Sequence, residues 1–217
     1  MKFECTWVGN FQNAVIGMRN PLNSWERSDS IQTPDGYNIG QADLDLMQRL
    51  LSTGNASDSK FMRQIAVSVQ ITCPAYFAAE LDTYKVGTTR NSCSLQHKGA
   101  SRDFMLEDFT FDEINEDVLT EGYDVVKEFI VGAINGYREL YKLTKDYKYF
   151  RIMRQLMPMG YNYTFMWSAN YEVLRNIYFQ RRHHQLKEWS EDFVGWIESL
   201  PYAKELIMFE PNKEKKQ

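Results

Sequence analysis

The sequence lacks a cysteine framework, a long apolar run and an excess of positive charge. Its three cysteines are an odd number, and their spacing matches neither a zinc site nor a set of disulfides. No stretch approaches the roughly 18 apolar residues that a membrane-spanning helix needs, and the opening residues MKFECTWVGN lack the apolar core of a signal peptide. We therefore expect a cytoplasmic protein with no metal site and no membrane partner.

The charge balance argues against a nucleic-acid partner. The chain has 25 basic and 29 acidic side chains, for a net charge of −4. Proteins that hold a nucleic-acid backbone usually carry an excess of positive charge. A local cationic pocket can still exist within such a chain. Aromatic residues make up 14% of the sequence, which suits stacking on a planar ligand but equally suits a large core or a subunit interface.

The pattern of elements predicts a mixed α/β fold, of the α+β kind, in a single domain. The 217 residues are enough for one hydrophobic core. Alternating apolar side chains predict strands over residues 2–8 and 65–73, and helical periodicity is strong from Tyr123 onward. We expect a small sheet with long C-terminal helices over residues 1–209, followed by a charged, disordered tail over residues 210–217.

Polar stretches mark the expected loops. Residues 20–40 are rich in Asn, Ser, Asp, Pro and Gly, and a loop of that length is usually functional or disordered. Residues 86–99 form a second polar stretch, and Asp112 is expected to cap the helical region that follows it. Further along, the sequence MPMGYNYTF interrupts the helical pattern, and we expect helices over residues 149–157, 168–182 and 185–199. The last of these carries an apolar stripe, which indicates a core or subunit contact.

Basic and amide side chains gather in the C-terminal half. Arg154 lies near the end of one predicted helix, Asn170, Asn176 and Arg181 lie on the next, and His184 follows its end. The planar fork of arginine suits a phosphate or the polar edge of a pyrimidine, and asparagine offers a donor and an acceptor to a base or flavin edge. The alternative is that these are ordinary surface residues of helices.

The polar stretch that begins at Val86 is a second candidate region. Gly87 is followed by hydroxyl, amide and guanidinium groups, among them Arg90, Asn91, Ser92 and Ser94. Such a loop can bring backbone N–H groups and hydroxyls close to a phosphate. The alternative is a plain solvent-exposed connection, because runs of Ser, Thr, Asn and Gly are common in loops.

One longer stretch resembles a known family. The sequence RQLMPMGYNYTFMWSANYEVLRNIYFQRR resembles the C-terminal motif region of the flavin-dependent thymidylate synthases, and IAVSVQITCPAYFAAELDTYK resembles the strand and Pro-initiated helix that lead into the signature of that family. The resemblance covers roughly residues 41–200. In the first stretch the family positions are matched without a gap by Arg154, Pro158, Trp167, Asn170, Leu174, Asn176 and Arg181.

The sequence departs from the family at its Arg-His-Arg signature. Thr83, Tyr84 and Lys85 stand at those three positions, and Cys93 stands at the position of the serine that follows. Ser92 and Ser94 flank Cys93, so a shift of one residue in the loop restores a serine. Outside the signature, Gln64 matches a family histidine and Glu172 replaces a basic residue.

The resemblance implies a flavin-dependent thymidylate synthase-like enzyme, a methyltransferase that converts dUMP to dTMP. Its co-substrates would be methylene-tetrahydrofolate and NADPH, and its cofactor would be FAD. The resemblance implies a homotetramer with active sites between subunits, and it assigns Arg181 a catalytic role in polarising the uracil. The implied dUMP-binding residues are Glu80, Arg90, Asn91, Ser92, Ser94, Arg154 and Arg181. The implied FAD-binding residues are Thr83, Tyr84, Lys85, Asn170, Asn176 and His184.

The sequence is also compatible with two other functions. The chain can be a relative that binds a nucleotide but has lost the reaction, or a relative that modifies another pyrimidine nucleotide. The colour of the purified protein separates the two enzyme functions from the relative that only binds a nucleotide, because a bound flavin is yellow and a protein that binds only a nucleotide is colourless.

Overall fold

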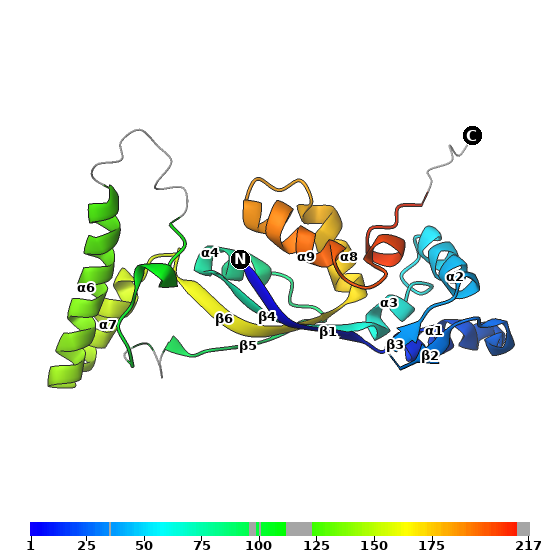
Figure 1. The fold of residues 1–217 in the computed structure, drawn as a ribbon, viewed down its shortest axis with the longest axis horizontal. Coiled ribbons are helices and arrows are strands. Elements are labelled where there is room, and N and C mark those ends of the chain that lie inside the picture. The colour runs from blue at the N-terminus through cyan, green and yellow to red at the C-terminus, as the bar shows by residue number, and fades with distance from the viewer. Residues whose placement is uncertain (35, 96–98, 100, 112–122, 212–217) are drawn as a thin grey trace.

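The chain folds into an elongated molecule with three parts along its long axis. The computed structural model describes residues 1–34, 36–95, 99, 101–111 and 123–211. An antiparallel sheet lies in the middle, a two-helix arm lies at one end and a group of short helices lies at the other (Figure 1). No helix in this described part of the chain combines the length and apolar character that crossing a membrane requires.

Four strands form the central sheet in the order β1-β4-β6-β5. Their bounds are Lys2–Gly9 for β1, Ala66–Pro74 for β4, Thr89–Ser92 for β5 and Asn162–Asn170 for β6. The two central strands pair antiparallel along their whole length, from Ala66 opposite Asn170 to Pro74 opposite Asn162. Alternate side chains of each strand are buried, as the two-residue period of a sheet with one covered face requires.

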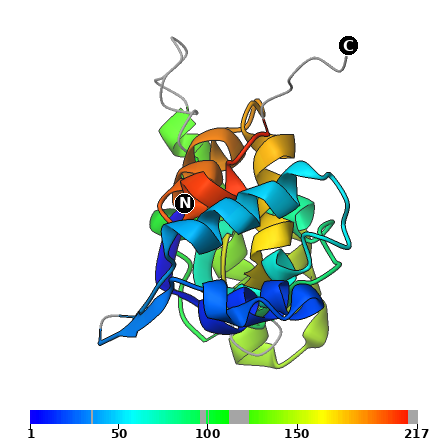
Figure 2. The same ribbon diagram turned by 90° about the vertical axis from the view of Figure 1, so that its right-hand side faces the viewer.

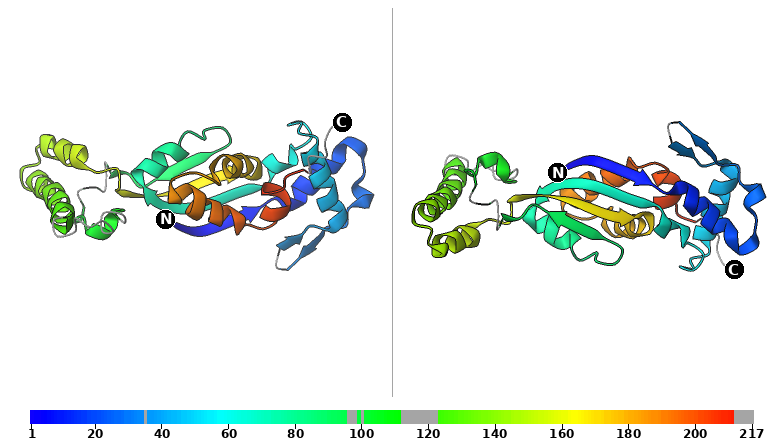
Figure 3. Two further views of the ribbon diagram at one scale, coloured as in Figure 1. Left: turned by 90° about the horizontal axis from the view of Figure 1, so that it is seen from above. Right: turned by 90° about the horizontal axis from the view of Figure 1, so that it is seen from below.

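Helices cover one face of this sheet and leave the other open. The covering helices are α4 (Ala75–Leu81), α8 (Tyr171–Arg181) and α9 (Val194–Glu198). Seen from below, the strands face the viewer with these helices behind them (Figure 3). The open face is polar at its centre, where the hydroxyls of Ser68 and Ser168 lie 2.7 Å apart. The prediction of a mixed fold with a small sheet and C-terminal helices is confirmed.

Three predicted segments need correction. The helix expected from residue 168 begins at Tyr171, because β6 continues through Asn170 as the partner of β4. The stretch 86–99 contains β5, an edge strand with a single neighbour, whose polar sequence TRNS shows no alternation. The expected helix over 185–199 divides into a π-helical turn over Glu188–Phe193 and the short α9.

The N-terminal end contains more structure than the long loop predicted over residues 20–40. Two 3₁₀ turns and a small hairpin lie there, and the hairpin projects to one side of the molecule (Figure 2). The elements are α1 (Phe11–Arg19), β2 (Ile31–Thr33), β3 (Gly36–Asn38), α2 (Gln41–Ser52) and α3 (Phe61–Gln64).

A buried ion pair fixes this end. Arg19 Nε donates to Asp43 Oδ1 at 2.6 Å, and the two side chains are 4% and 0% exposed. The same guanidinium donates to the carbonyl groups of Ser24 and Arg27. The other Asp43 oxygen accepts from the hydroxyls of Ser28 and Ser30, both at 2.6 Å. The loop is therefore folded around this carboxylate.

The arm at the opposite end has a core of its own. It consists of α6 (Tyr123–Thr144) and α7 (Tyr147–Leu156), packed side by side (Figure 1). The buried side chains that hold it together are Leu95, Phe104, Phe109, Val131, Ile134, Phe150 and Met153. The cap predicted at Asp112 and residues 212–217 of the predicted tail lie outside the described residues.

Candidate functional site

Arg181, the last residue of α8, lies at the centre of a cluster of polar and aromatic side chains. Its Nε donates to the hydroxyl of Tyr84 at 2.9 Å, and its Nη1 lies 3.4 Å from Glu80 Oε2. The guanidinium carbon lies 4.7 Å from the ring centre of Trp189 and 5.7 Å from that of Tyr84. The side chain is 21% exposed. These contacts leave Nη2 to donate to a ligand that enters from the solvent side.

Glu80 is held in place by a buried tryptophan. The indole Nε1 of Trp189 donates to Glu80 Oε2 at 2.8 Å, the same oxygen that faces Arg181. Trp189 is fully buried and packs against Phe77 and Phe193. Because a buried indole N–H needs an acceptor, the core of the domain fixes the carboxylate, and the carboxylate orients the arginine.

Tyr84 connects Glu80 and Arg181 to the exposed side of α8. Its hydroxyl accepts from Arg181 and donates to Gln180 Oε1 at 2.9 Å. Gln180 Nε2 in turn donates to Asn176 Oδ1 at 2.8 Å, one helical turn back. The result is a continuous line of hydrogen bonds from Asn176 to Arg181.

The N-terminus of α8 meets the segment that follows α4. Asn170 caps the helix, because its Oδ1 accepts from the backbone N–H of Val173 at 3.1 Å. Gly87 lies against this cap with a φ of +75°, and a Cβ there would come within 3.1 Å of Asn170 Nδ2. Glycine is therefore needed at this position both for its backbone conformation and for the close approach.

The phosphate-binding residues expected after Gly87 lie on β5 and at its end. Arg90 stacks on Phe165, 4.2 Å from the ring centre, and donates to Asp82 at 2.8 Å. Asn91 and Ser92 are exposed on the edge strand. Ser94 lines a small cavity of about 150 Å³ farther along. They do not join Arg181 in the hydrogen-bonded cluster.

Three of the predicted flavin contacts are engaged in local structure or exposed. The Thr83 hydroxyl donates to the carbonyl of Glu80 at 2.7 Å, and Lys85 is exposed. His184 Nδ1 accepts from the backbone N–H of Leu186 at 3.2 Å, and its ring lies 6.4 Å from that of Trp189.

Arg154 is not brought to Arg181 within one chain. It lies on α7, in the arm beyond the end of the sheet, whereas α8 covers the sheet (Figure 1). There it lines a shallow depression with Tyr147, Phe150, Arg151 and Gln155. A role for Arg154 beside Arg181 therefore requires another copy of the chain.

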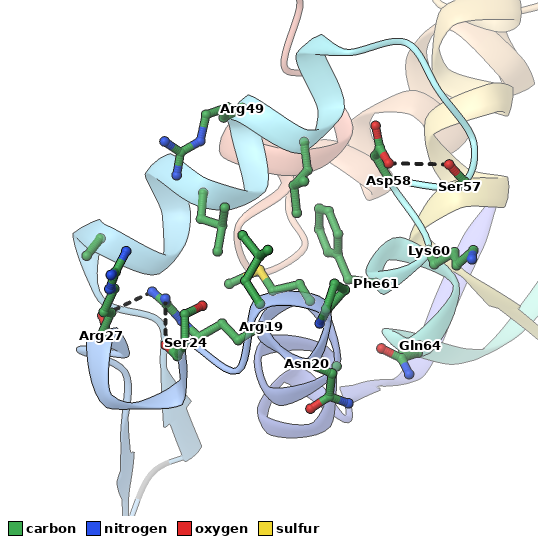
Figure 4. Close-up of a pocket in the computed structure, with 17 residues that line it drawn as sticks. Arg19, Asn20, Ser24, Arg27, Arg49, Ser57, Asp58, Lys60, Phe61 and Gln64 are labelled. Carbon is green, nitrogen blue, oxygen red and sulfur yellow. Dashed lines mark hydrogen bonds between the residues drawn. The ribbon is translucent and has the colours of Figure 1, made fainter.

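A large pocket at the N-terminal end was not predicted from the sequence. A pocket of about 560 Å³ lies between the end of α1, the outer face of α2 and the segment that leads into α3 (Figure 4). Phe61, Met18, Leu46 and Leu50 give it apolar walls. The length of the polar stretch 20–40 was the only signal that pointed to this end.

Cationic side chains surround this pocket. Arg27, Arg49 and Lys60 line it and are exposed. Asp58 is the acidic residue of the lining, and it accepts a hydrogen bond from the hydroxyl of Ser57. Figure 4 shows Arg27 and Arg49 on one side of the pocket and Lys60 on the other. Gln64, the match to a family histidine, also lines it. Apolar walls with a cationic rim suit an anionic ligand that has a planar or aliphatic body.

Among the residues that the structure describes, no group of three or more His, Cys, Asp or Glu side chains is placed to hold a metal ion. The cluster around Arg181 instead offers hydrogen-bond donors, a carboxylate and aromatic surface. Such a set can orient the polar edge of a small planar ligand.

Solved structures match the chain over almost its whole length. A crystal structure of the flavin-dependent thymidylate synthase ThyX from Helicobacter pylori, complexed with FAD and dUMP, superposes with a TM-score of 0.66 at 18% identity, covering 95% of this chain and 97% of that one. The fold is that of a flavin-dependent thymidylate synthase. A second structure of the Helicobacter pylori enzyme with FAD and dUMP gives a TM-score of 0.65 at 19% identity, with the same coverage. Comparisons with protein-family models and with curated proteins found no match.

Proposed function

We propose that this protein binds dUMP at the cluster centred on Arg181 and converts it to dTMP with FAD, NADPH and methylene-tetrahydrofolate. The observation that carries the proposal is the Arg181 guanidinium, which is part-exposed, fixed by Glu80 and Tyr84, and backed by Trp189. It is supported by a fold shared with structures that hold FAD and dUMP.

In this proposal Arg181 recognises and activates the pyrimidine. Its free Nη2 donates to the polar edge of the uracil, and its positive charge stabilises the negative charge that develops on the ring. Glu80 and Tyr84 hold the guanidinium so that little reorganisation is needed when the ligand arrives. Asn176 and Gln180 extend the same hydrogen-bonded surface along α8.

In this proposal the pocket at the N-terminal end holds FAD. Its volume of about 560 Å³ lies within the range of roughly 300–1,000 Å³ found for small-molecule sites. Its lining residues Arg27, Arg49 and Lys60 would offer positive charge to the phosphates of FAD. Bound FAD, reduced by NADPH, supplies the hydride of the reaction.

A homo-oligomer, most simply a tetramer, completes this proposal. Arg154 lies on the arm, away from Arg181 of its own chain. A second copy would present its Arg154 to the nucleotide phosphate, for which a guanidinium fork is well suited.

A second candidate function is nucleotide binding without turnover. The observation that favours it is Tyr84, which stands at the position of the family histidine and uses its hydroxyl for two internal hydrogen bonds. Modification of another pyrimidine nucleotide is a variant of the main proposal, because Arg181 would recognise the ring edge in the same way.

The visible spectrum of the purified protein and a turnover assay separate these functions. The main proposal predicts a flavin absorption band that increases on adding FAD, and dTMP formed from dUMP when NADPH and methylene-tetrahydrofolate are present. Binding of dUMP with no flavin band and no product supports the second candidate. Failure to bind FAD, dUMP and other pyrimidine nucleotides overturns both.

A further inference from the structure

The outer face of α6 is apolar and has no partner among the described residues. Val131 and Ile134 face the core of the arm and are buried. On the opposite side of the helix, Phe129 and Leu143 are 74% and 79% exposed, and Leu140 is 39% exposed. Large apolar side chains at that exposure are costly to leave in water when they form a continuous stripe.

Two glycines interrupt this stripe. Gly132 and Gly136 lie between the large side chains, and a Cβ at either position would meet nothing within 4 Å. No packing within the described chain requires them, although glycine is unfavourable in the interior of a helix. Glycines on an exposed helix face allow another backbone to approach closely.

The spacing of large and small residues is self-complementary. Phe129, Gly136 and Leu143 recur at two-turn intervals, so they lie on one line of the helix. A two-fold axis through Gly136 places a second α6 antiparallel to the first. Phe129 then contacts Leu143 of the second copy, and Leu140 of the second copy packs against Gly132. In such a symmetric interface each contact occurs twice.

We propose that α6 docks on α6 of a second copy of this chain, antiparallel and centred on Gly136. The contact uses the stripe Phe129, Gly132, Gly136, Leu140 and Leu143, which we call the α6 stripe. Helices packed in this way stay in contact over several turns. The proposal does not depend on nucleotide binding.

Charges beside the α6 stripe support a second copy as the occupant. Glu128 and Lys142 lie on the same flank of the stripe, and the two-fold axis brings Glu128 of one copy toward Lys142 of the other. Glu139, which binds Lys142 at 3.1 Å, adds a second carboxylate to that flank. A flank with two carboxylates does not suit binding to an anionic lipid surface, because helices that bind such surfaces carry mainly basic residues on their polar face.

The proposed contact also has a consequence for the arm. Because α7 packs beside α6, the contact holds together the two arms that carry Arg154. The dimer would therefore fix the position of the helix on which the predicted phosphate-binding arginine lies.

Cysteine cross-linking tests the contact at its axis. Gly136→Cys is introduced into a background in which the exposed Cys5 and Cys93 are changed to serine. On the proposed axis the two new thiols approach closely enough to form a disulfide, which needs Cα atoms within about 7 Å. Mild oxidation should give a species of twice the 25.6 kDa chain mass on a denaturing gel.

The matched control is Gly195→Cys in the same background. Gly195 is also an exposed helical glycine with nothing within 4 Å of its Cβ, but it lies on α9. Selective cross-linking at position 136 supports the proposal. No cross-link at 136, or equal cross-linking at both positions, overturns it.

Sedimentation of a charged variant gives an independent test. Phe129→Glu combined with Leu143→Glu should halve the mass of the sedimenting species, because both side chains are exposed in the single chain and pack only in the dimer. Ile31→Glu, which places a charge on another exposed apolar side chain, should leave the mass unchanged. A monomeric wild-type protein, or an unchanged mass in the double variant, contradicts the proposal.

Discussion

Glu80 Oε2 accepts a hydrogen bond from the buried indole of Trp189 at 2.8 Å and faces Arg181 Nη1 at 3.4 Å. One carboxylate oxygen thus joins the core of the domain to the cation at the proposed nucleotide site. The arrangement explains how a part-exposed arginine keeps a defined position. It also means that changes at Glu80 affect both stability and binding.

Replacement of Glu80 separates these two effects. In Glu80→Ala the buried Trp189 N–H loses its acceptor, so we expect a loss of about 1–3 kcal/mol in the free energy of unfolding. Glu80→Gln keeps an acceptor oxygen and should lose less, while still removing the charge beside Arg181. Urea denaturation of the two variants and the wild type measures the difference. Equal stability of all three would show that the indole finds another acceptor.

Gly87 is predicted to be essential for the way the loop meets α8. Gly87→Ala places a Cβ 3.1 Å from Asn170 Nδ2 on a backbone with φ of +75°. The left-handed conformation alone costs about 1–2 kcal/mol for a residue with a Cβ, and the contact adds to it. Gly54→Ala is the matched control, because Gly54 has φ of +69° but nothing within 4 Å. A thermal melt should show a larger decrease in melting temperature for Gly87→Ala than for Gly54→Ala. Equal decreases would show that the contact with Asn170 does not contribute to stability.

The Asp43 carboxylate should make the N-terminal end sensitive to acid. Burial alone would raise the pKa of Asp43, but hydrogen bonds from Ser28, Ser30 and Arg19, with the Arg19 charge, outweigh it and lower the pKa below its ordinary value of 3.8. The stability that the carboxylate contributes is therefore present above pH 3.8 and is lost as the pH falls through the lowered pKa.

Asp43→Asn tests this interpretation. The variant leaves Arg19 buried without its counter-charge, and loss of one partner of a buried pair costs about 3–5 kcal/mol. The difference in unfolding free energy between wild type and variant should be largest near neutral pH and should narrow as the pH falls below 3.8. A difference that does not change across that range would assign the stabilisation to packing.

The sequence predicted the parts of the fold that have a strong apolar period. The central strand β4 alternates buried side chains such as Val67 and Val69, and its prediction over 65–73 agrees with the structure within a residue or two at each end. β5 was missed because an edge strand of Thr, Arg, Asn and Ser forms only through its pairing with β6. The start of α8 was placed too early because β4, which is remote in sequence, extends β6 to Asn170.

The candidate site was predictable only in part. The resemblance singled out Glu80, Tyr84 and Arg181, and the structure brings these three into contact, although their roles in binding stay a prediction. Trp189 was missed because an apolar stripe indicates a core residue, and it is one, but its indole nitrogen also serves the site. Arg154 could not be placed from the sequence, because the spatial separation of α7 and α8 depends on the tertiary fold.

Calorimetric titration of dUMP into the wild type, Arg181→Ala and Arg182→Ala tests the central claim most directly. Arg182 is the matched control, because it is adjacent in sequence but pairs with Glu210 at 2.6 Å outside the cluster. Loss of a charge-assisted hydrogen bond should weaken binding to Arg181→Ala by about 1.5–3 kcal/mol, and Arg182→Ala should bind like the wild type. Undiminished affinity of Arg181→Ala for dUMP would contradict the account.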